Sequence, residues 1–213
     1  MSQKEAFLSQ INFFSKRFKV YAPDLTGFGE NDYMPYPYAL CDYLNDFLSL
    51  VKATENAKVS VIAHSFGCRI TLKALCETNA VKQAVLVGAA GLKTKKSARC
   101  HLKRLGYKLC KPFLTREILE KKFFSQDYNM LTEVKKQSFK LVTSELFDDK
   151  LKLIKAPVFA VFGEKDKETP TYLADRIERG VYKAQKYIMK GCGHFCFLDN
   201  PAEFNFVVNE FLN

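Results

Sequence analysis

The sequence has no long apolar run. Its longest stretches of this kind, such as Ala84–Leu92, extend over about nine residues, whereas a helix that crosses a membrane needs about 20. The first five residues, Met1–Glu5, also lack the basic stretch, the apolar stretch and the small-residue cleavage site of a secretory leader. We therefore expect a cytoplasmic protein without a transmembrane segment.

Glycine and proline are scarce. The 213 residues include 10 Gly and 7 Pro against 19 Phe, and 47% of the chain is hydrophobic. Such a composition can bury a large core, which excludes the disordered and fibrous classes. At roughly 100–200 residues per domain, the length predicts one globular domain with room for a small insertion.

Paired cysteine spacings are missing as well. The cysteines are odd in number and the chain is long enough to need no disulfide staples, so we expect reduced thiols. There are seven of them: Cys41, Cys68, Cys76, Cys100, Cys110, Cys192 and Cys196. Cys192, His194 and Cys196 form a C-x-H-x-C pattern, but no second cluster completes the four ligands that zinc usually takes. We therefore expect no metal site.

Positive charge is concentrated in one segment. The chain carries 33 basic and 23 acidic residues, a net charge of +10, and residues 93–122 hold eleven Lys or Arg against two Glu. Apolar residues recur there at helical spacing, which predicts an amphipathic cationic helix (Ala98, Leu102, Leu105 and Leu109). Its charge could attract an acidic substrate, lie on an anionic membrane or hold nucleic acid. We favour a solvated outer face and expect no nucleic-acid partner, because no recognition motif accompanies the charge.

Predicted strands and helices alternate along the chain, which indicates an α/β fold: a mostly parallel sheet with helices on both faces. We expect strands over residues 19–23, 58–63, 83–88, 158–162 and 185–189. Helices are expected over residues 39–52, 65–76, 171–179 and 201–212, and residues 93–147 are mostly helical. A further helix begins at Ser2, where a capping box with Glu5 precedes apolar residues at helical spacing (Phe7, Ile11, Phe14 and Phe18).

A serine stands at the apex of a predicted strand–turn–helix. The strand 59–62 runs into Ala63-His64-Ser65-Phe66-Gly67 and then into a helical pattern, which is the arrangement of a nucleophile elbow. The turn needs small residues two positions before and after the serine, and Ala63 and Gly67 meet this need. Ser65 Oγ would be exposed, and the Phe66 N–H would point at a developing oxyanion. The alternative is that Ser65 only caps the helix.

A carboxylate and a histidine follow two later strands. Asp166 comes after the strand 158–162, and His194, one of three histidines with His64 and His101, comes after the strand 185–189. Parallel strands place all three side chains at one sheet edge. In acyl transfer, His194 would take the proton of Ser65, and Asp166 would hold the imidazole in its productive tautomer. Alternatively, Asp166 is a turn residue and His194 a histidine at the edge of the core.

Four segments together resemble the α/β-hydrolase superfamily: the loop 22–29, the elbow 63–67, the acid segment 163–170, and Gly193-His194 followed by Pro201. The resemblance covers nearly the whole chain. It implies a core of residues 1–92 and 148–213 and a helical cap of residues 93–147, with the cationic helix in a lid over the pocket. Asn31 departs from the serine that many members carry, with no evident catalytic meaning.

The N-terminus departs more seriously from the superfamily. Members usually have two or three strands before the first helix, and the last ends in a His-Gly loop with a second oxyanion amide. No His-Gly pair precedes Ser65. In the superfamily's strand order, the missing strand lies between the strands expected at 19–23 and 58–63, so a central slot would stay open unless the strand 19–23 shifts or another chain fills it. Either translation starts further upstream, which we favour, or the chain is a shortened form.

The sequence thus predicts a serine hydrolase that acts on a small carboxylic ester or related acyl substrate through an acyl-enzyme. Ser65 is the expected nucleophile, His194 the base, Asp166 the orienting acid and the Phe66 N–H the remaining oxyanion donor. We expect no cofactor. The basic segment favours a substrate with an anionic end, and the oligomeric state stays open. The alternatives are an impaired or non-catalytic shortened protein, or a lyase or carbon–carbon bond hydrolase of the same superfamily.

Overall fold

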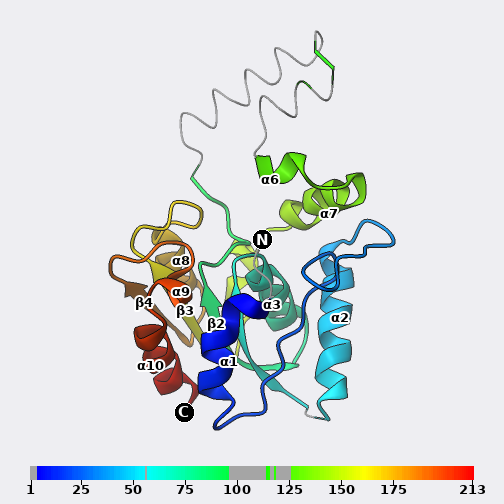
Figure 1. Cartoon of the computed structure of the whole chain (residues 1–213). Coiled ribbons are helices and arrows are strands. Elements are labelled where there is room, and N and C mark those ends of the chain that lie inside the picture. Colours follow the sequence, from blue (N-terminus) through cyan, green and yellow to red (C-terminus); the bar gives the residue numbers. More distant parts are fainter. Residues whose placement is uncertain (1–3, 56, 96–113, 116–117, 119–125) are drawn as a thin grey trace.

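A sheet of four parallel strands in the order β1-β2-β3-β4 forms the centre of the molecule (Figure 1). The structure, a computed structural model, describes residues 4–55, 57–95, 114–115, 118 and 126–213. The strands are β1 (Val59–His64), β2 (Val81–Val87), β3 (Val158–Gly163) and β4 (Ala184–Met189). All four lie within two residues of their predicted positions, which confirms the predicted fold class.

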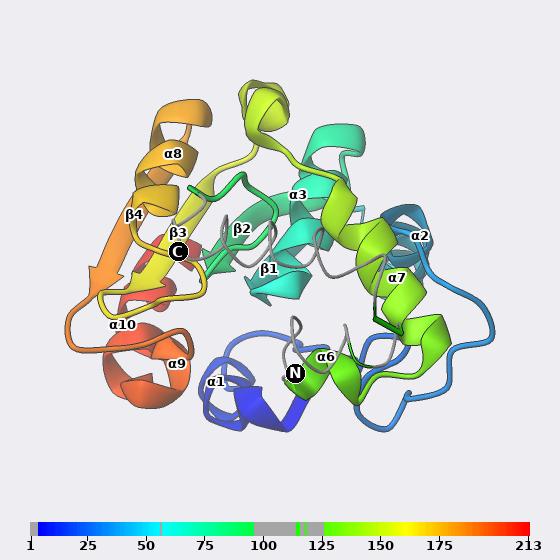
Figure 2. The same ribbon diagram turned by 90° about the horizontal axis from the view of Figure 1, so that it is seen from above.

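Helices cover both faces of the sheet, as the view from above shows (Figure 2). One face carries α2 (Leu40–Ala53), α3 (Phe66–Glu77) and α8 (Tyr172–Gly180); the other carries α1 (Leu8–Phe14), α9 (Cys196–Asp199) and α10 (Pro201–Leu212). Alternate residues of each strand enter opposite cores: Ala84 and Leu86 pack on the first face, Val85 and Val87 on the second. The helices predicted at 39–52, 65–76, 171–179 and 201–212 are therefore confirmed.

The predicted strand at residues 19–23 is wrong. These residues form no regular element and are all exposed, Val20 by 37% and Tyr21 by 42%. A strand exists only where a neighbour accepts and donates its backbone hydrogen bonds. β1 ends the sheet order and pairs with β2 alone among the described strands, so residues 19–23 have not shifted over to it.

The first helix is shorter than predicted. A 3₁₀ turn, η1 (Lys4–Phe7), leads into α1, which ends at Phe14 instead of continuing to Phe18; Ser2 lies outside the described residues. Phe14 is buried, whereas Phe18 is 40% exposed. The helix is anchored by tertiary contacts: Phe7 stacks on Phe197 at 4.4 Å, and Gln10 Nε2 donates to the Phe197 carbonyl at 3.0 Å.

Only part of the predicted cap is described. It contains α6 (Gln126–Asn129) and α7 (Glu133–Ser144), which lie above the sheet in Figure 1, and a 3₁₀ turn, η2 (Asp148–Leu153), leads back to β3. Arg69 of α3 holds the end of α7 by donating to the carbonyls of Val142 and Glu145 at 3.2 and 2.9 Å. Most of the predicted cationic helix lies outside the described residues, so its shape and the domain division stay predictions.

In the described ranges, no helix is both long enough and apolar enough to cross a membrane. The cysteines within those ranges are free thiols: Cys41, Cys68, Cys76, Cys192 and Cys196. Cys100 and Cys110 lie outside them.

Candidate active site

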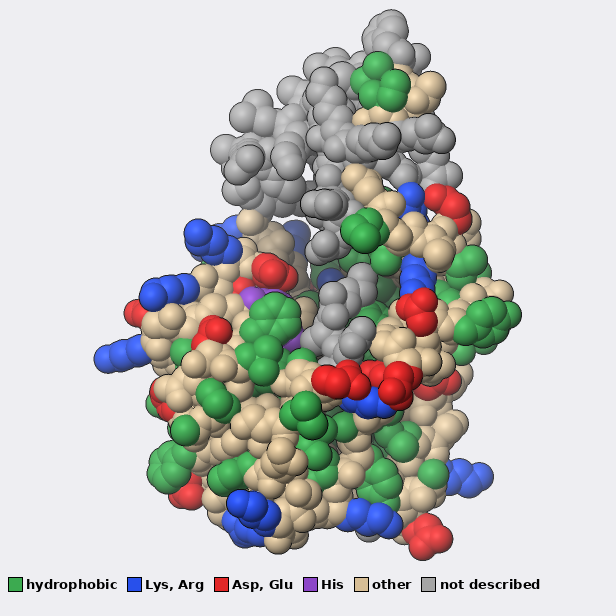
Figure 3. Space-filling view, in the orientation of Figure 1, with side chains coloured by type: hydrophobic (Ala, Val, Ile, Leu, Met, Phe, Trp, Pro, Cys, Tyr) green, Lys and Arg blue, Asp and Glu red, His purple; other side chains and the backbone are tan. Residues whose placement is uncertain are grey.

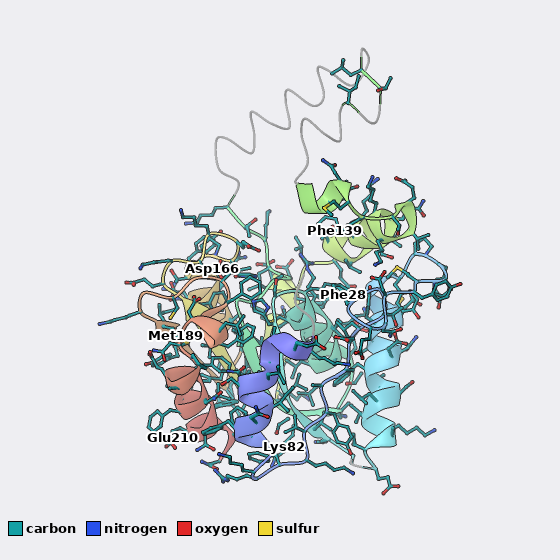
Figure 4. The ribbon with its side chains drawn as sticks, in the orientation of Figure 1. Phe28, Lys82, Phe139, Asp166, Met189 and Glu210 are labelled. Atoms are coloured by element: carbon teal, nitrogen blue, oxygen red, sulfur yellow. The ribbon has the colours of Figure 1, made fainter. Side chains whose placement is uncertain are left out.

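The three predicted catalytic side chains follow the carboxyl ends of neighbouring parallel strands. The strand register pairs His64 with Val87, Val87 with Val161, and Gly163 with Met189, so these ends lie at one edge of the sheet. Figure 4 shows Asp166 at this upper edge and Lys82, near the start of β2, at the opposite end. Ser65 follows β1, Asp166 follows β3 and His194 follows β4.

Ser65 occupies a strained turn. Its backbone has φ +47° and ψ −107°, a conformation that residues other than glycine rarely adopt. The turn is fixed by a hydrogen bond from Ser65 N to the Val87 carbonyl at 2.9 Å. A Cβ on Gly67 would lie 3.6 Å from Ala63 Cβ, an ordinary contact, so the elbow needs small residues at both positions but tolerates alanine.

Phe66 begins α3, and its ring fixes the start of that helix. The ring stacks on Phe28 at 5.6 Å and meets the edge of Tyr43 at 5.0 Å. An N–H in the first turn of a helix has no intrahelical acceptor, so the Phe66 amide is available to an anion beside Ser65. Its role as the oxyanion donor stays a prediction.

Asp166 is buried and fully hydrogen-bonded. Its side chain is 0% exposed and accepts from the N–H groups of Glu168 and Thr169 at 2.8 and 2.9 Å, from Thr169 Oγ1 at 2.7 Å and from His194 Nδ1 at 2.8 Å. Burial alone would raise the pKa of this carboxyl, but the hydrogen bonds from His194 and Thr169 outweigh burial and lower it. Asp166 is therefore a carboxylate at neutral pH.

The His194 imidazole is oriented by that carboxylate. Burial disfavours its charged form, yet the hydrogen bond and the charge of Asp166, with a further contribution from Glu168, raise its pKa above the ordinary value. Nδ1 bonds to Asp166, and Nε2 lies 3.5 Å from the exposed Glu168 carboxylate. Among the described residues, no hydrogen bond joins Nε2 to Ser65 Oγ. Figure 3 shows histidine at the surface of this region beside acidic side chains.

The acid and base loops are joined to each other by their backbones. Lys165 N donates to the Cys192 carbonyl at 2.8 Å, and Glu164 N donates to the Met189 carbonyl at 3.0 Å. The contact is so close that a Cβ on Gly163 would lie 2.0 Å from the Gly193 carbonyl oxygen. These bonds fix the separation of Asp166 from His194.

Sequence reasoning missed two residues of this region. Thr169 braces Asp166 through both its backbone and its hydroxyl, and the Asp-x-x-Thr spacing of a side-chain-capped turn was the available signal. His64 was considered only as a rival to His194; its Nε2 lies 3.0 Å from the His194 carbonyl oxygen. No local sequence pattern could predict this contact, because the two residues are 130 positions apart.

The cysteines beside His194 do not form a metal site. Cys192 and Cys196 are buried, and burial raises the pKa of both thiols, that of Cys196 to about 12, which disfavours the thiolate that binds metals. The His194 ring is already engaged by Asp166. Across the part of the chain that the structure describes, no three His, Cys, Asp or Glu side chains are grouped to hold a metal ion.

Solved structures of two hydrolases share the fold of this chain. A meta-cleavage product hydrolase from Pseudomonas fluorescens has a TM-score of 0.75 and 21% identity, and the match covers 100% of this chain and 86% of that one. An enol-lactonase from Burkholderia xenovorans has a TM-score of 0.76 and 15% identity, over 99% of this chain and 87% of that one.

Sequence searches agree with this likeness. An uncharacterized protein of Mycobacterium tuberculosis is 24% identical over 93% of this chain and 69% of its own length. The profile of the alpha/beta hydrolase family matches residues 4–205. With a profile match over nearly the whole length and the four parallel strands described above, the chain belongs to the alpha/beta hydrolase family.

Proposed function

We propose that this protein is a serine hydrolase that cleaves a small carboxylic ester or a related acyl substrate, with Ser65 as nucleophile, His194 as base and Asp166 as orienting acid. The observation that carries the proposal is the strained Ser65 turn at the same sheet edge as a buried Asp166–His194 pair joined at 2.8 Å. Backbone strain and a buried carboxylate both cost stability, and they are typical of reaction sites.

The reaction follows from these positions. Ser65 Oγ attacks the substrate carbonyl carbon while its proton passes to His194 Nε2, and the Phe66 N–H stabilises the oxyanion. The imidazolium, held by Asp166, then gives this proton to the leaving alcohol as the carbon–oxygen bond breaks. Water then attacks the acyl-enzyme and gives a proton to His194, which passes it to Ser65 Oγ as the acyl carbon–oxygen bond breaks and the acid is released. No cofactor is needed in this sequence.

Two observations bear on the substrate class. The enol-lactonase to which the chain is structurally similar acts, by its name, on a cyclic ester. Within the described residues, Glu168 places a negative charge 3.5 Å from His194 Nε2. This carboxylate would repel an anionic group of the substrate placed next to His194. We therefore expect any anionic group of the substrate to lie toward the basic segment 93–122 and away from Glu168.

Hydrolysis of a carbon–carbon bond is the second candidate. The similarity to a meta-cleavage product hydrolase over the whole of this chain favours it. The two functions separate in a substrate panel: the first requires turnover of p-nitrophenyl acetate or butyrate, and the second requires turnover of a meta-cleavage product with little ester cleavage.

Reaction with a fluorophosphonate tests the proposal. The folded protein is exposed to the reagent and its intact mass is measured, with Ser65→Ala as the matched control. One adduct that the S65A variant does not form is the expected result. A cooperatively folded protein that forms no adduct would overturn the proposal in favour of a non-catalytic member of the family.

A further inference from the structure

His64 connects the nucleophile turn to the loop of the base. It is the last residue of β1 and directly precedes Ser65. Its side chain is buried, with the residue 7% exposed, and its Nε2 lies 3.0 Å from the backbone carbonyl oxygen of His194. Ser65 stands in the strained turn that follows, so the side chains of His64 and Ser65 can serve different partners from one fixed backbone.

The direction of this hydrogen bond is determined by chemistry. A carbonyl oxygen only accepts, so His64 Nε2 must carry the proton. The ring packs against the rings of His194, Phe195 and Phe197, with centroids 4.6, 4.9 and 5.0 Å away. Burial, with the nearby His194, lowers the pKa of His64 to about 4, so the ring is neutral near pH 7. The charged group that acts on it in the opposite direction is Asp166.

We propose that His64 is a positioning residue that holds the backbone of His194 at the distance from Ser65 that proton transfer needs. The inference rests on the proposed function. Asp166 holds the His194 imidazole, but the loops that carry these two residues follow β3 and β4, not the strand that precedes Ser65. The His64–His194 hydrogen bond ties this pair to the strand that carries the nucleophile. A displacement of about 1 Å in such a site can lower the rate about 100-fold.

A purely structural role is the competing explanation, and the chain offers a matched control for it. Gln10 Nε2 also donates from a buried side chain to a backbone carbonyl of the same segment, that of Phe197 at 3.0 Å. Gln10→Leu removes this donor without touching His194. If the segment only needs anchoring, the Gln10 and His64 variants should behave alike.

The test compares His64→Gln, His64→Asn and Gln10→Leu. Glutamine places an amide N–H near the position of His64 Nε2, and asparagine is one methylene too short. We expect the fluorophosphonate labelling rate and kcat for p-nitrophenyl acetate to fall about 10- to 100-fold in H64N, with KM within about threefold. H64Q and Q10L should stay within about threefold of the wild type. If H64N does not fold, H64F, whose ring fills the aromatic cluster, takes its place.

Two results would overturn the proposal: an H64N rate within threefold of the wild type, or equal losses in H64N and Q10L. A readout independent of turnover is the far-downfield proton resonance of the Asp166–His194 hydrogen bond. It should persist in H64Q and Q10L and broaden or vanish in H64N. If the three variants show this pattern but the wild type forms no adduct, the proposed function fails while the positional role stands. An unchanged resonance in H64N counts against that role.

Discussion

Two regions of the molecule are held in different ways. The acid–base region, residues 158–199, is fixed by backbone hydrogen bonds between its loops, by four hydrogen bonds to Asp166 and by the buried strand β3. The segment 15–23, before β1, has mostly exposed side chains and forms no strand. Asp166 and His194 are thus brought together without help from the segment 15–23. The nucleophile side instead depends on the packing of Phe28, Tyr43 and Phe66.

The largest effect is expected from breaking the acid–base region at its centre. Asp166→Asn keeps the size of the side chain but removes the charge that holds the His194 tautomer. We expect kcat for p-nitrophenyl acetate to fall about 10³- to 10⁴-fold, while thermal unfolding shows an intact fold. Asp175→Asn on α8, whose carboxylate pairs with Lys186 at 2.7 Å, is the surface control. Equal activity in both variants would mean that Asp166 has no part in the reaction.

A second substitution tests the close contact of the two loops. Gly163→Ala would place a Cβ 2.0 Å from the Gly193 carbonyl oxygen, and neither backbone can move away easily. We expect a loss of at least about 3 kcal/mol in the free energy of unfolding by urea. Gly191→Ala is the matched control, because a Cβ there meets nothing within 4 Å although φ is +73°. It should cost about 1–2 kcal/mol; a smaller cost for G163A than for G191A would contradict the geometry.

The stability of the folded protein should also depend on His64. The folded protein holds this ring neutral down to a pKa of about 4, whereas the unfolded chain binds the proton near 6.5. Stability is therefore lost as the pH falls from about 6.5 to about 4, by about 3 kcal/mol. Urea unfolding at pH 7.0, 5.5 and 4.5 measures this loss. In H64Q the loss should be smaller by most of that amount, and an identical pH dependence in both proteins would refute the assignment.

A smaller effect is expected at the rim of the site. The Glu168 carboxylate favours the imidazolium of His194, so Glu168→Gln should lower the pKa of His194 and move the acidic limb of kcat/KM to lower pH. Because the Glu168 side chain is 69% exposed, kcat/KM on that limb should rise by less than about threefold. Salt should shrink the difference between the two proteins. A limb that moves to higher pH would contradict this reading of the charge.

The smallest effect on stability is expected from a Val→Thr substitution in the segment 15–23, compared with the same substitution in β3. Valine and threonine have the same shape, so Val→Thr measures the burial of a hydroxyl. Val20→Thr, in the exposed segment, should change the free energy of unfolding by less than about 0.5 kcal/mol. Val161→Thr, at 0% exposure in β3, should cost about 1–3 kcal/mol. Similar costs at both positions would mean that residues 19–23 are buried in solution.

Most of the fold was predictable because its signals are local. Strands β1 to β4 are short segments in which most residues are apolar. The segment 19–23 has the same kind of sequence, but whether it forms a strand depends on a neighbour, and no local pattern reports a missing neighbour. The predicted end of the first helix was wrong for a related reason: the apolar spacing continues to Phe18, but the helix ends at Phe14, which is buried, whereas Phe18 is exposed.

The residues of the candidate site that belong to sequence motifs were predictable. Ser65, Asp166 and His194 each follow a strand end, and parallel pairing brings those ends to one edge. The supporting contacts were less visible. Thr169 is near its partner in sequence, so its spacing gave a usable signal. The bond between His64 and His194 joins two segments 130 positions apart, and its discovery requires the folded chain.

The Ser65 turn places stability and chemistry in opposition at a single position. A glycine adopts φ +47° without the penalty that a Cβ brings, so Ser65→Gly would relieve about 1–2 kcal/mol of backbone strain and also delete the proposed nucleophile. The most stable residue for this turn is thus an inactive one. Selection for thermostability alone would remove the serine, and engineering for a higher melting temperature must leave position 65 untouched and find its gains elsewhere in the fold.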